Sequence, residues 1–584
     1  MSDINNTGIE ESKELEIKYY DLVLSGIEER FISENYNTSN LDNGVYELIE
    51  TEKMTITFTT TENQKNNINN NMTTIHLGEC ETRLRKFYNI SNNETLYMKK
   101  LDIAQEGMTA KKVLFDVYCK LNGTNLIKLN LTVCEDAEIS ISIPFELTDD
   151  IEKYNSSSRY YNDICYTATS EDGTDIPLKD RQTNFIKEDK IICQENCKFT
   201  QYDYNIGIAK CSCISNETPK SIADMKINEM KLLDNFINIK NFANFNFLFC
   251  YKVLFCKKGI IYNIGSYILL SIIIFHLITY FIFYIKKYAA LKKKIKKIRI
   301  IQKNVKKEIL DVGSFSNKLL TTNLKFKRKK KKYKKGKKLK ILYQIKNSVE
   351  LMNNFNDEEY NTLPYNLAIA YDKRTYCEIY ASLLRTQHNF ISSFINNNDY
   401  NSQIIKIDLF FISFAIEYSM NALFYDDDTM HKIYKSSGAF DFKTQFPIMI
   451  YSLLFSNALN QPLNYFGLSN DDIITFKQDR TRINYIKRIK LLKKKLSIKF
   501  ISFFIISSLL LVFLWYYVSM FCAIYKNTQI HLICDTLMSF GISMLFPFVF
   551  YLLPGIFRII SLSGKARKKL LYEFSKFINY LEII

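Results

Sequence analysis

Phe500–Tyr525 reads FISFFIISSLLLVFLWYYVSMFCAIY and carries no charged residue over 26 positions. A second uncharged run, TLMSFGISMLFPFVFYLLPGIF, follows at Thr536–Phe557. A helix needs about 20 apolar residues to cross a hydrocarbon core about 30 Å thick, and in lipid its backbone polar groups must bond to one another. Both runs are too long for the alternative, a buried hairpin of a soluble protein. The sequence therefore predicts two transmembrane helices here.

Three further apolar runs precede this pair. Asn263–Ile285 (NIGSYILLSIIIFHLITYFIFYI) is predicted as the first membrane helix. Ile407–Tyr425 and Phe446–Phe466 are marginal because each contains polar residues. We predict that both span the membrane, since the linker between them is acidic whereas the following Lys477–Lys499 has ten basic residues and one acid, as cytoplasmic loops do. A pair of soluble or interfacial helices is the alternative.

The polar residues inside these runs are the candidate functional side chains. They are Glu417, His276, Asn457, Asn460 and Gln461. Glu417 is expected to be the one intramembrane carboxylate, which makes it a functional candidate, with His276 or the face formed by Asn457, Asn460 and Gln461 as its partner. A structural hydrogen bond between helices is favoured over an ion path. His276 has no acidic partner that the sequence reveals, so no proton relay is assigned to it.

The positive charge is concentrated directly after hydrophobic segments. The chain has 584 residues and a net charge of +17. Lys286–Arg299 is basic at eight of 14 positions, and Lys325–Lys340 at 12 of 16. Such clusters stay in the cytoplasm and adsorb to anionic lipid, a role favoured here over nuclear import or nucleic-acid binding. The sequence thus predicts that the first membrane helix runs from outside to inside.

Cysteines and glycosylation signals mark the N-terminal part as extracellular. Eight of 13 cysteines precede residue 220 and are disulfide candidates: Cys80, Cys119, Cys134, Cys165, Cys193, Cys197, Cys211 and Cys213. The Asn-X-Ser/Thr acceptors are Asn5, Asn37, Asn71, Asn89, Asn93, Asn122, Asn130, Asn155 and Asn216, and the sequence has none after residue 250. An even number of cysteines with many acceptors indicates an oxidising, glycosylating compartment.

The strand signals also lie in this N-terminal part. Leu126–Val133 (LIKLNLTV) and Glu138–Ile143 (EISISI) alternate apolar and polar residues, the period of a half-buried strand. Disulfides are favoured over zinc for Cys193–Cys213, because the spacing does not fit a zinc ribbon and no histidine lies nearby. Asp172-Gly-Thr-Asp175 lacks the acidic positions of a calcium loop and is predicted to be a turn.

The predicted fold class is an integral membrane, α-helical multi-pass protein with about five transmembrane helices and an N-terminal disulfide-rich, β-rich extracellular domain. In order, the predicted parts are a disordered or incorrectly assigned start without a signal peptide (1–72), the ectodomain (73–214), a stalk (215–262), the first membrane helix (263–285), a basic cytoplasmic loop (286–403) with an amphipathic helix at Leu363–Arg385, the second and third helices (407–425, 446–466), a basic loop (467–499), the fourth and fifth helices (500–525, 536–557) and an amphipathic cytoplasmic tail (558–584). The tail places Leu570, Phe574, Phe577 and Leu581 on one helical face, against the membrane surface or the loop helix.

Three stretches carry a resemblance to known proteins: YYNDICYTATSEDGTDIPLKDR from Tyr160, NALFYDDDTMHKIY from Asn421 and WYYVSMFCAIYKNTQIHLICDTLMSF from Trp515. Over roughly residues 70–584 the chain resembles a family of uncharacterised multi-pass membrane proteins of single-celled eukaryotes. It is more weakly similar to the first five membrane helices of polycystin-1-like proteins, through Cys211-Ser-Cys213, Asn421–Tyr425 and Trp515-Tyr-Tyr. The self-cleavage signal of that group does not follow Cys213, and the sequence ends where its pore region would begin. The second resemblance therefore implies an accessory or sensing part.

The sequence contains no recognisable catalytic motif, with only five histidines, no HExxH, no Gly-rich phosphate loop and no Gly-x-Ser-x-Gly. No enzymatic activity, cofactor or metal is predicted. The expected function is surface recognition or sensing, or an accessory role beside a membrane-protein partner, in the plasma membrane or another membrane of the secretory pathway, with the C-terminus in the cytoplasm. The alternatives are a transporter or channel subunit that uses Glu417, and a scaffold that works through Lys325–Lys340.

Overall fold

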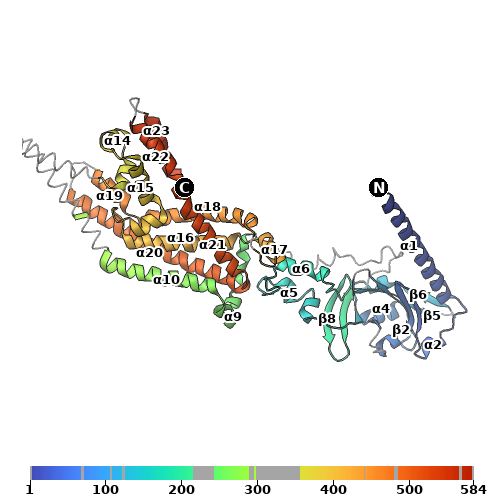
Figure 1. Cartoon of the computed structure of the whole chain (residues 1–584). Helices are drawn as coiled ribbons and strands as arrows, with labels where there is room; N and C mark the ends of the chain where they lie inside the picture. The colour runs from blue at the N-terminus through green and yellow to red at the C-terminus, as the bar shows by residue number, and fades with distance from the viewer. Residues whose placement is uncertain are drawn as a thin grey trace, which may run out of the picture. The chain divides into compact units, whose positions relative to one another are not determined.

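The computed structural model divides into two compact units, which are described separately (Figure 1). The first unit comprises Met1–Ala168 and Ile176–Lys240, and the second comprises Thr169–Asp175 and Asn241–Ile584. The structure describes residues 3–66, 72–105, 108–120, 125–214, 242–287, 295–296, 355–439, 441–478, 485–563 and 568–581.

An antiparallel five-stranded sheet forms one half of the first unit. Its order is β1-β2-β4-β5-β6, made of β1 (Glu47–Glu50), β2 (Met54–Thr60), β4 (Tyr97–Ala104), β5 (Lys111–Lys120) and β6 (Leu126–Lys128). Helix α1 (Asp3–Ile32) places Phe31 in the core beside Phe58, their rings 4.1 Å apart. The prediction that residues 1–72 are disordered is therefore wrong for most of that segment. Strand β2 is an inner strand of this sheet. Its sequence, MTITFTT, is rich in β-branched residues, and the sequence analysis did not recognise it as a strand.

A second antiparallel sheet has the order β3-β7-β9-β8, made of β3 (Thr74–His76), β7 (Glu138–Pro144), β9 (Ile208–Ile214) and β8 (Cys197–Asp203). The strand predicted at Glu138–Ile143 is confirmed as β7, with Ile139, Ile141 and Ile143 buried. The strand predicted at Leu126–Val133 ends early. Asn130 Oδ1 accepts a hydrogen bond from Thr132 N at 2.9 Å and begins the 3-10 turn η1 (Leu131–Cys134) instead.

Short helices complete this unit: α2 (Ser39–Asp42), α3 (Thr61–Asn66), α4 (Glu79–Phe87), η2 (Ile151–Tyr154), α5 (Arg159–Asn162) and α6 (Leu178–Lys187).

Disulfides join Cys80 to Cys134, Cys193 to Cys211 and Cys197 to Cys213. Cys165 and Cys250 are disulfide-bonded as well. Cys119 was predicted to be bonded and is a free thiol, buried to 1% exposure among the apolar side chains of the core. The eighth bonded cysteine is thus Cys250, which lies beyond the cysteine-rich region of the sequence.

The second unit is helical. Its long helices are α10 (Ile264–Ile282), continued by the π-helical turn η5 (Phe283–Lys287), and α16 (Gln403–Phe424), α18 (Phe442–Gly467), α20 (Tyr485–Ile524), α21 (Gln529–Phe550) and α22 (Leu552–Ser563). Within the described residues, four stretches are long and apolar enough to cross a membrane: Ile264–Ile285, Gln403–Phe424, Lys487–Ile524 and Gln529–Ser563. Helices α10, α16 and α20 pack side by side (Figure 1). Helix α18, at the place of the predicted third membrane helix, packs on α16, α20 and α21 and falls outside the set of four, because its sequence is more polar.

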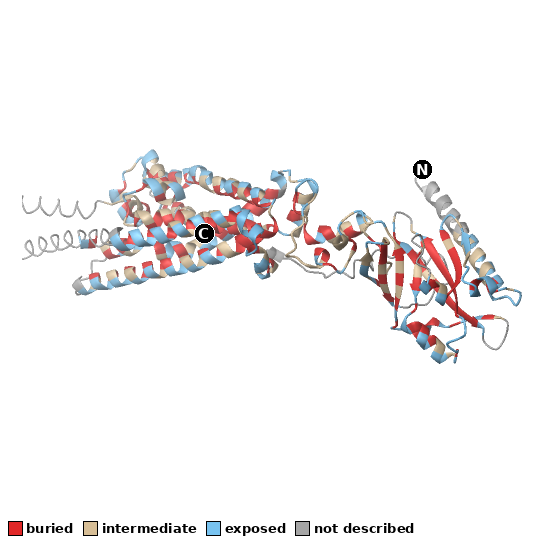
Figure 2. Cartoon of the chain, turned by 90° about the horizontal axis from the view of Figure 1, so that it is seen from below, coloured by how far each residue is buried: buried red, intermediate tan, exposed pale blue. Residues whose placement is uncertain are grey.

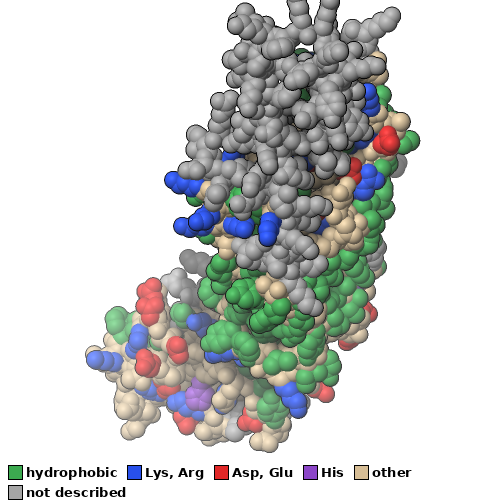
Figure 3. All heavy atoms as spheres, turned by 90° about the vertical axis from the view of Figure 1, so that its left-hand side faces the viewer, with side chains coloured by type: hydrophobic (Ala, Val, Ile, Leu, Met, Phe, Trp, Pro, Cys, Tyr) green, Lys and Arg blue, Asp and Glu red, His purple; other side chains and the backbone are tan. Residues whose placement is uncertain are grey.

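The outer faces of these helices are apolar. On α10, for example, Tyr267, Ile274 and Phe281 are each at least half exposed. Figure 2 shows exposed residues along the outer sides of the long helices, and Figure 3 shows hydrophobic side chains spread over the helical unit. Soluble monomers rarely leave so large an apolar surface uncovered, so contact with lipid explains it best.

The remaining helices are α8 (Tyr251–Leu254), α9 (Lys257–Ile261), α13 (Asp357–Thr362), α14 (Tyr365–Tyr371), α15 (Tyr376–Gln387), α17 (Asp427–Lys435), α19 (Asn470–Gln478) and α23 (Lys569–Leu581), with the 3-10 helix η4 (Phe242–Phe249) and the π-helical turn η6 (Ile391–Ile395). The single amphipathic helix predicted at Leu363–Arg385 is wrong. Pro364 is the N-cap residue of α14, and Thr375 caps α15 in a capping box with Glu378, so the segment folds as separate short helices.

Several predicted boundaries also change. The fourth membrane helix and the last part of the basic loop before it form the single helix α20, which starts at Tyr485. The fifth starts earlier than predicted, at Gln529. The described part of the predicted stalk is helical, and one of its side chains, Phe247, is fully buried against Tyr525. Lys325–Lys340 and most of Lys286–Arg299 lie outside the described residues.

Candidate functional site

Buried polar side chains connect α10, α16, α20 and α21 in the helical unit. Near the N-terminal end of α16, His276 Nδ1 lies 2.8 Å from Asp408 Oδ2, and both side chains are 1% exposed. His276 Nε2 lies 3.1 Å from Ser508 Oγ. The sequence analysis found no acidic partner for His276. Asp408 could have been recognised, because it is a carboxylate in the first turn of the predicted second membrane helix.

Glu417 lies on the same helix, in a ladder of polar residues. Glu417, Asn421 and Tyr425 follow one another at intervals of four residues and so share one face of α16. Glu417 accepts a hydrogen bond from Ser539 Oγ of α21. Asn421 Nδ2 donates to Ser539 Oγ at 3.2 Å and to Thr536 Oγ1 at 3.1 Å. The sequence analysis expected the partner of Glu417 to be His276 or the polar face of α18. The structure shows Ser539 of α21 in that place instead.

Asp535 continues this ladder, since it accepts a hydrogen bond from the hydroxyl of Tyr425. Asp535 is 1% exposed and Asp408 is fully buried, so Glu417 is not the only carboxylate inside the apolar helices. Asp535 lies one residue before the predicted fifth helix and was missed because the helix was started too late. The polar residues of α18 are not gathered here. Asn460 Nδ2 donates to Ser413 Oγ at 2.9 Å, Gln461 is half-buried and Asn457 is exposed.

At the first residues of α21, a loop formed by Thr169–Asp175 docks onto the turn between α20 and α21. Both carboxylate oxygens of Asp175 accept hydrogen bonds there. The donors are Thr528 N (2.8 Å), Thr528 Oγ1 (2.9 Å), Asn527 N (2.9 Å) and Asn527 Nδ2 (3.1 Å). Asp175 is 4% exposed, and burial raises the pKa of its carboxyl, while the donors from Thr528 and Asn527 oppose the shift. A carboxylate at this position satisfies backbone donors at the start of a helix.

The docked loop is the turn that the sequence predicted at Asp172–Asp175. Ser170 N donates to Thr174 O at 2.8 Å, and Gly173 has a φ of +82° in the left-handed region. Asp172 Oδ2 accepts a hydrogen bond from Ser437 Oγ at 2.9 Å. Both aspartates of the loop therefore accept hydrogen bonds from protein donors. Among the residues that the structure describes, no group of three or more His, Cys, Asp and Glu side chains is arranged to hold a metal ion.

A buried arginine organises the opposite end of the same unit. Arg558 of α22 is 1% exposed, and its Nε donates to Asp372 Oδ2 at 3.0 Å. Its Nη1 donates to Asn361 O at 3.0 Å. Arg374 Nε also donates to Asp372, at 2.8 Å. Burial alone would raise the pKa of the Asp372 carboxyl, but the two guanidinium groups outweigh it and hold that pKa below its usual range. The sequence analysis gave Arg558 only as the end of a membrane helix.

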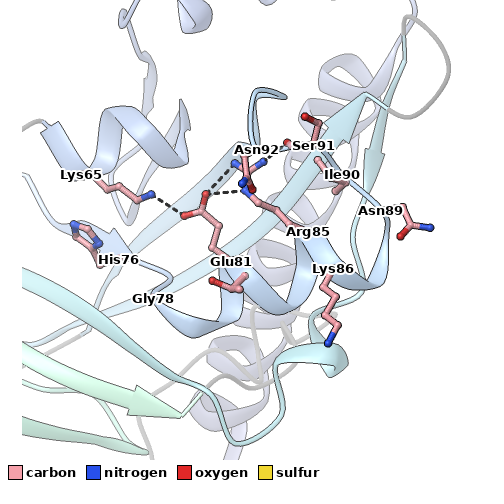
Figure 4. A pocket seen from close by; sticks show the side chains of 11 residues that line it. Lys65, His76, Gly78, Glu81, Arg85, Lys86, Asn89, Ile90, Ser91 and Asn92 are labelled. Carbon is pink, nitrogen blue, oxygen red and sulfur yellow. Dashed lines mark hydrogen bonds and ion pairs between the residues drawn. The ribbon is translucent and has the colours of Figure 1, made fainter.

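In the first unit, a hollow of about 730 Å³ is lined by Lys65, His76, Gly78, Glu81, Thr82, Arg85, Lys86, Asn89, Ile90, Ser91 and Asn92 (Figure 4). Glu81 joins two of the basic groups, with Lys65 Nζ and Arg85 Nη2 each 2.9 Å from its carboxylate. Arg85 Nη1 also donates to Ser91 O at 2.9 Å. Because these charges are paired within the protein, the hollow indicates no particular ligand.

The predicted glycosylation acceptors are on the surface where they are described. Asn37, Asn89, Asn93 and Asn130 are exposed, and Asn155 is half-buried. Asn71, Asn122 and Asn216 lie outside the described residues, as does the side chain of Asn5.

No protein-family model, no curated protein and no solved structure matches this chain. The resemblances seen in the sequence, to a family of uncharacterised membrane proteins and to polycystin-1-like proteins, stay predictions.

Proposed function

We propose that this chain is a multi-pass membrane protein that acts in recognition or sensing at a surface of the cell or of the secretory pathway. Its disulfide-bonded unit would lie outside, glycosylated, and its basic segments would lie in the cytoplasm against anionic lipid. Four apolar helices and at least three disulfides support the membrane and the oxidising compartment. Helix α18 would be the fifth membrane helix.

The observation that supports a sensing role is the contact of Asp175 with the residues that begin α21. The loop Thr169–Asp175 interrupts the first unit in sequence, yet it packs with the helical unit. Its carboxylate is bonded to the residues that begin α21, and α21 carries the partners of Glu417 and Asn421. A displacement of this loop would thus act directly on the start of a helix whose other contacts lie inside the membrane.

The test compares Asp175→Ala with the wild type by hydrogen exchange of the full chain in lipid nanodiscs. We expect faster exchange at the backbone amides of Asn527–Leu532, because Asn527 N and Thr528 N lose their acceptor. Asp172→Ala is the matched control: it removes one bond to Ser437 in the same loop and should leave these amides unchanged. Unchanged exchange in Asp175→Ala would mean that the loop does not control α21, and the sensing role would lose its support.

The second candidate function is translocation, and the buried carboxylates Asp408, Glu417 and Asp535 favour it. The discriminating variant is Glu417→Gln, which keeps the size of the side chain and removes its titratable carboxyl group. We expect vesicles containing this variant to show the same ion flux and the same pH dependence of flux as vesicles containing the wild type. A wild-type flux above that of empty vesicles, lost in Glu417→Gln, would favour a transporter or channel subunit.

A further inference from the structure

Helix α23 folds back along α22 and exposes an apolar face. Tyr572 OH donates to Leu363 O at 2.8 Å, and Ser575 Oγ donates to Pro554 O at 2.8 Å. These bonds bury one side of α23, with Tyr572 and Ser575 at 0% and 1% exposure. The other side presents Leu570, Phe574 and Phe577, which are 85%, 44% and 55% exposed. This is the face that the sequence predicted, and nothing in the described part of the chain covers it.

The length of the preceding apolar stretch places this hairpin at the membrane boundary. Gln529–Ser563 has 35 residues. At 1.5 Å per residue it would extend roughly 50 Å, whereas the hydrocarbon core is about 30 Å thick and is crossed by about 20 residues. Asp175 fixes the start of α21 among polar groups. The core should therefore be crossed near the end of α21 at Phe550, so α22 and α23 lie at the level of the lipid headgroups.

The exposed surface of the hairpin has the chemistry of this boundary. On α22, Leu553 and Ile560 are 52% and 47% exposed, although the helix lies beyond the core. Lys568 and Lys569 are exposed at the start of α23, and Lys565 and Arg567 precede them in the sequence. An apolar helix face flanked by basic residues binds in the plane of an anionic membrane surface. The buried contact of Arg558 with Asp372 holds the hairpin in position.

We propose that the α22–α23 hairpin lies in the headgroup region of the leaflet at the C-terminal end of α21 and inserts Leu570, Phe574 and Phe577 into its acyl boundary, with a preference for anionic lipid. The charge distribution predicts this to be the cytoplasmic leaflet. The inference rests on the proposed membrane location. It adds a binding surface that neither sensing nor translocation requires. Anionic lipid attracts the lysines that flank the apolar face, whereas a second copy of the same basic face would repel them.

The test uses tryptophan fluorescence of the full chain in vesicles. Trp515, the only tryptophan, is replaced by Phe, and Phe574→Trp is added. Lipids brominated near the headgroup should quench this tryptophan more strongly than lipids brominated deep in the chain. Phe87→Trp is the matched control, because Phe87 is a 66% exposed phenylalanine on the disulfide-bonded unit and should not be quenched. Adding Lys568→Glu and Lys569→Glu should remove most of the quenching in anionic vesicles and little of it in neutral ones.

Three outcomes would overturn the proposal or its premise. If Phe574→Trp is quenched no more than Phe87→Trp in protein that resists alkaline carbonate extraction, the hairpin does not bind lipid and the membrane assignment stands. If Phe574→Cys creates dimer crosslinks that persist when the vesicles are diluted with lipid, a second copy covers the face. If carbonate extracts the protein, the membrane location itself is wrong.

Discussion

Asp372 shows how a single buried carboxylate can organise the end of the helical unit. Its side chain is fully buried between Arg374 and Arg558. The buried charge of Arg558 requires compensation, and Asp372 supplies it together with the carbonyl oxygens of Asn361 and Tyr360, which accept from Arg558. The guanidinium of Arg558 also lies 4.9 Å from the centre of the Tyr572 ring on α23. One arginine therefore connects α13, α22 and α23.

Removing this arginine should destabilise the unit. For Arg558→Ala we expect a loss of about 3 kcal/mol of unfolding free energy, because breaking a buried ion pair leaves uncompensated polar groups. Arg558→Lys should lose less, since it keeps the charge but donates to fewer of the same acceptors. The measurement is denaturant unfolding in detergent micelles. Arg488→Ala is the control, because Arg488 is only partly buried and its replacement should cost less stability. Equal stability of Arg558→Ala and the wild type would contradict the role given to this residue.

At the scale of elements, one thiol departs from the pattern of bonded cysteines around it. Cys119 lies on the inner strand β5 with its side chain in the core, and burial raises its pKa to about 11. A thiol that is both buried and protonated reacts slowly. Cys80 and Cys134, by contrast, tie α4 to the turn η1 and belong to the same core. Position in the sheet thus decides which cysteine of this unit is left unpaired.

Thiol labelling measures this directly. Without reductant, the folded protein in detergent should be alkylated at Cys256, Cys377 and Cys534, which are exposed, and not at the buried Cys119 and Cys522. After denaturation without reductant, Cys119 should react too, and a total of five thiols should be labelled. Peptide mass spectrometry identifies the sites. Labelling of Cys80 or Cys134 before reduction, or a Cys119 that reacts only after reduction, would contradict the disulfide assignment.

At the scale of the whole molecule, the two units differ in where their apolar side chains lie. The first unit buries its apolar side chains between and beside its sheets, as water-soluble domains do. The second leaves an apolar outer surface and buries polar ladders between its helices, which is the arrangement expected in lipid. The proposed orientation follows from disulfides on one side and basic segments on the other.

Sidedness can be tested on sealed membrane vesicles from expressing cells. We expect glycosidase treatment to reduce the apparent mass of the full chain, with Asn89→Gln and Asn93→Gln each removing part of the shift. Protease added to the cytoplasmic side should cut within Lys325–Lys340 and spare the disulfide-bonded unit. Protection of Lys325–Lys340, or an N-terminal unit without any glycan, would reverse the proposed orientation or remove it.

How much of this could be predicted depended on whether the signal was local. Helix length and strand periodicity are properties of one segment, so β7 was predicted correctly, and four of the five predicted membrane helices coincide with helices long and apolar enough to cross a membrane. Asp408 could be recognised in the sequence as a carboxylate of a membrane helix, but its pairing with His276 could not be predicted, nor could that of Glu417 with Ser539, because each partner lies on another helix more than 100 residues away. The predicted grouping of Glu417 with Asn457, Asn460 and Gln461 was wrong since sequence gives the polarity of a helix and not its rotation about its axis. Asp175 was predicted only as part of a turn.

By itself the sequence determined that this chain has helices long enough for a bilayer, a cysteine-rich part before them and basic segments after them, because these properties reside in runs of neighbouring residues. Only the tertiary structure decided that Asp175 binds the start of α21, that Asp408 faces His276, and that Cys119 is left free. Each of these depends on which faces of distant elements meet, and that is set by packing the whole chain at once.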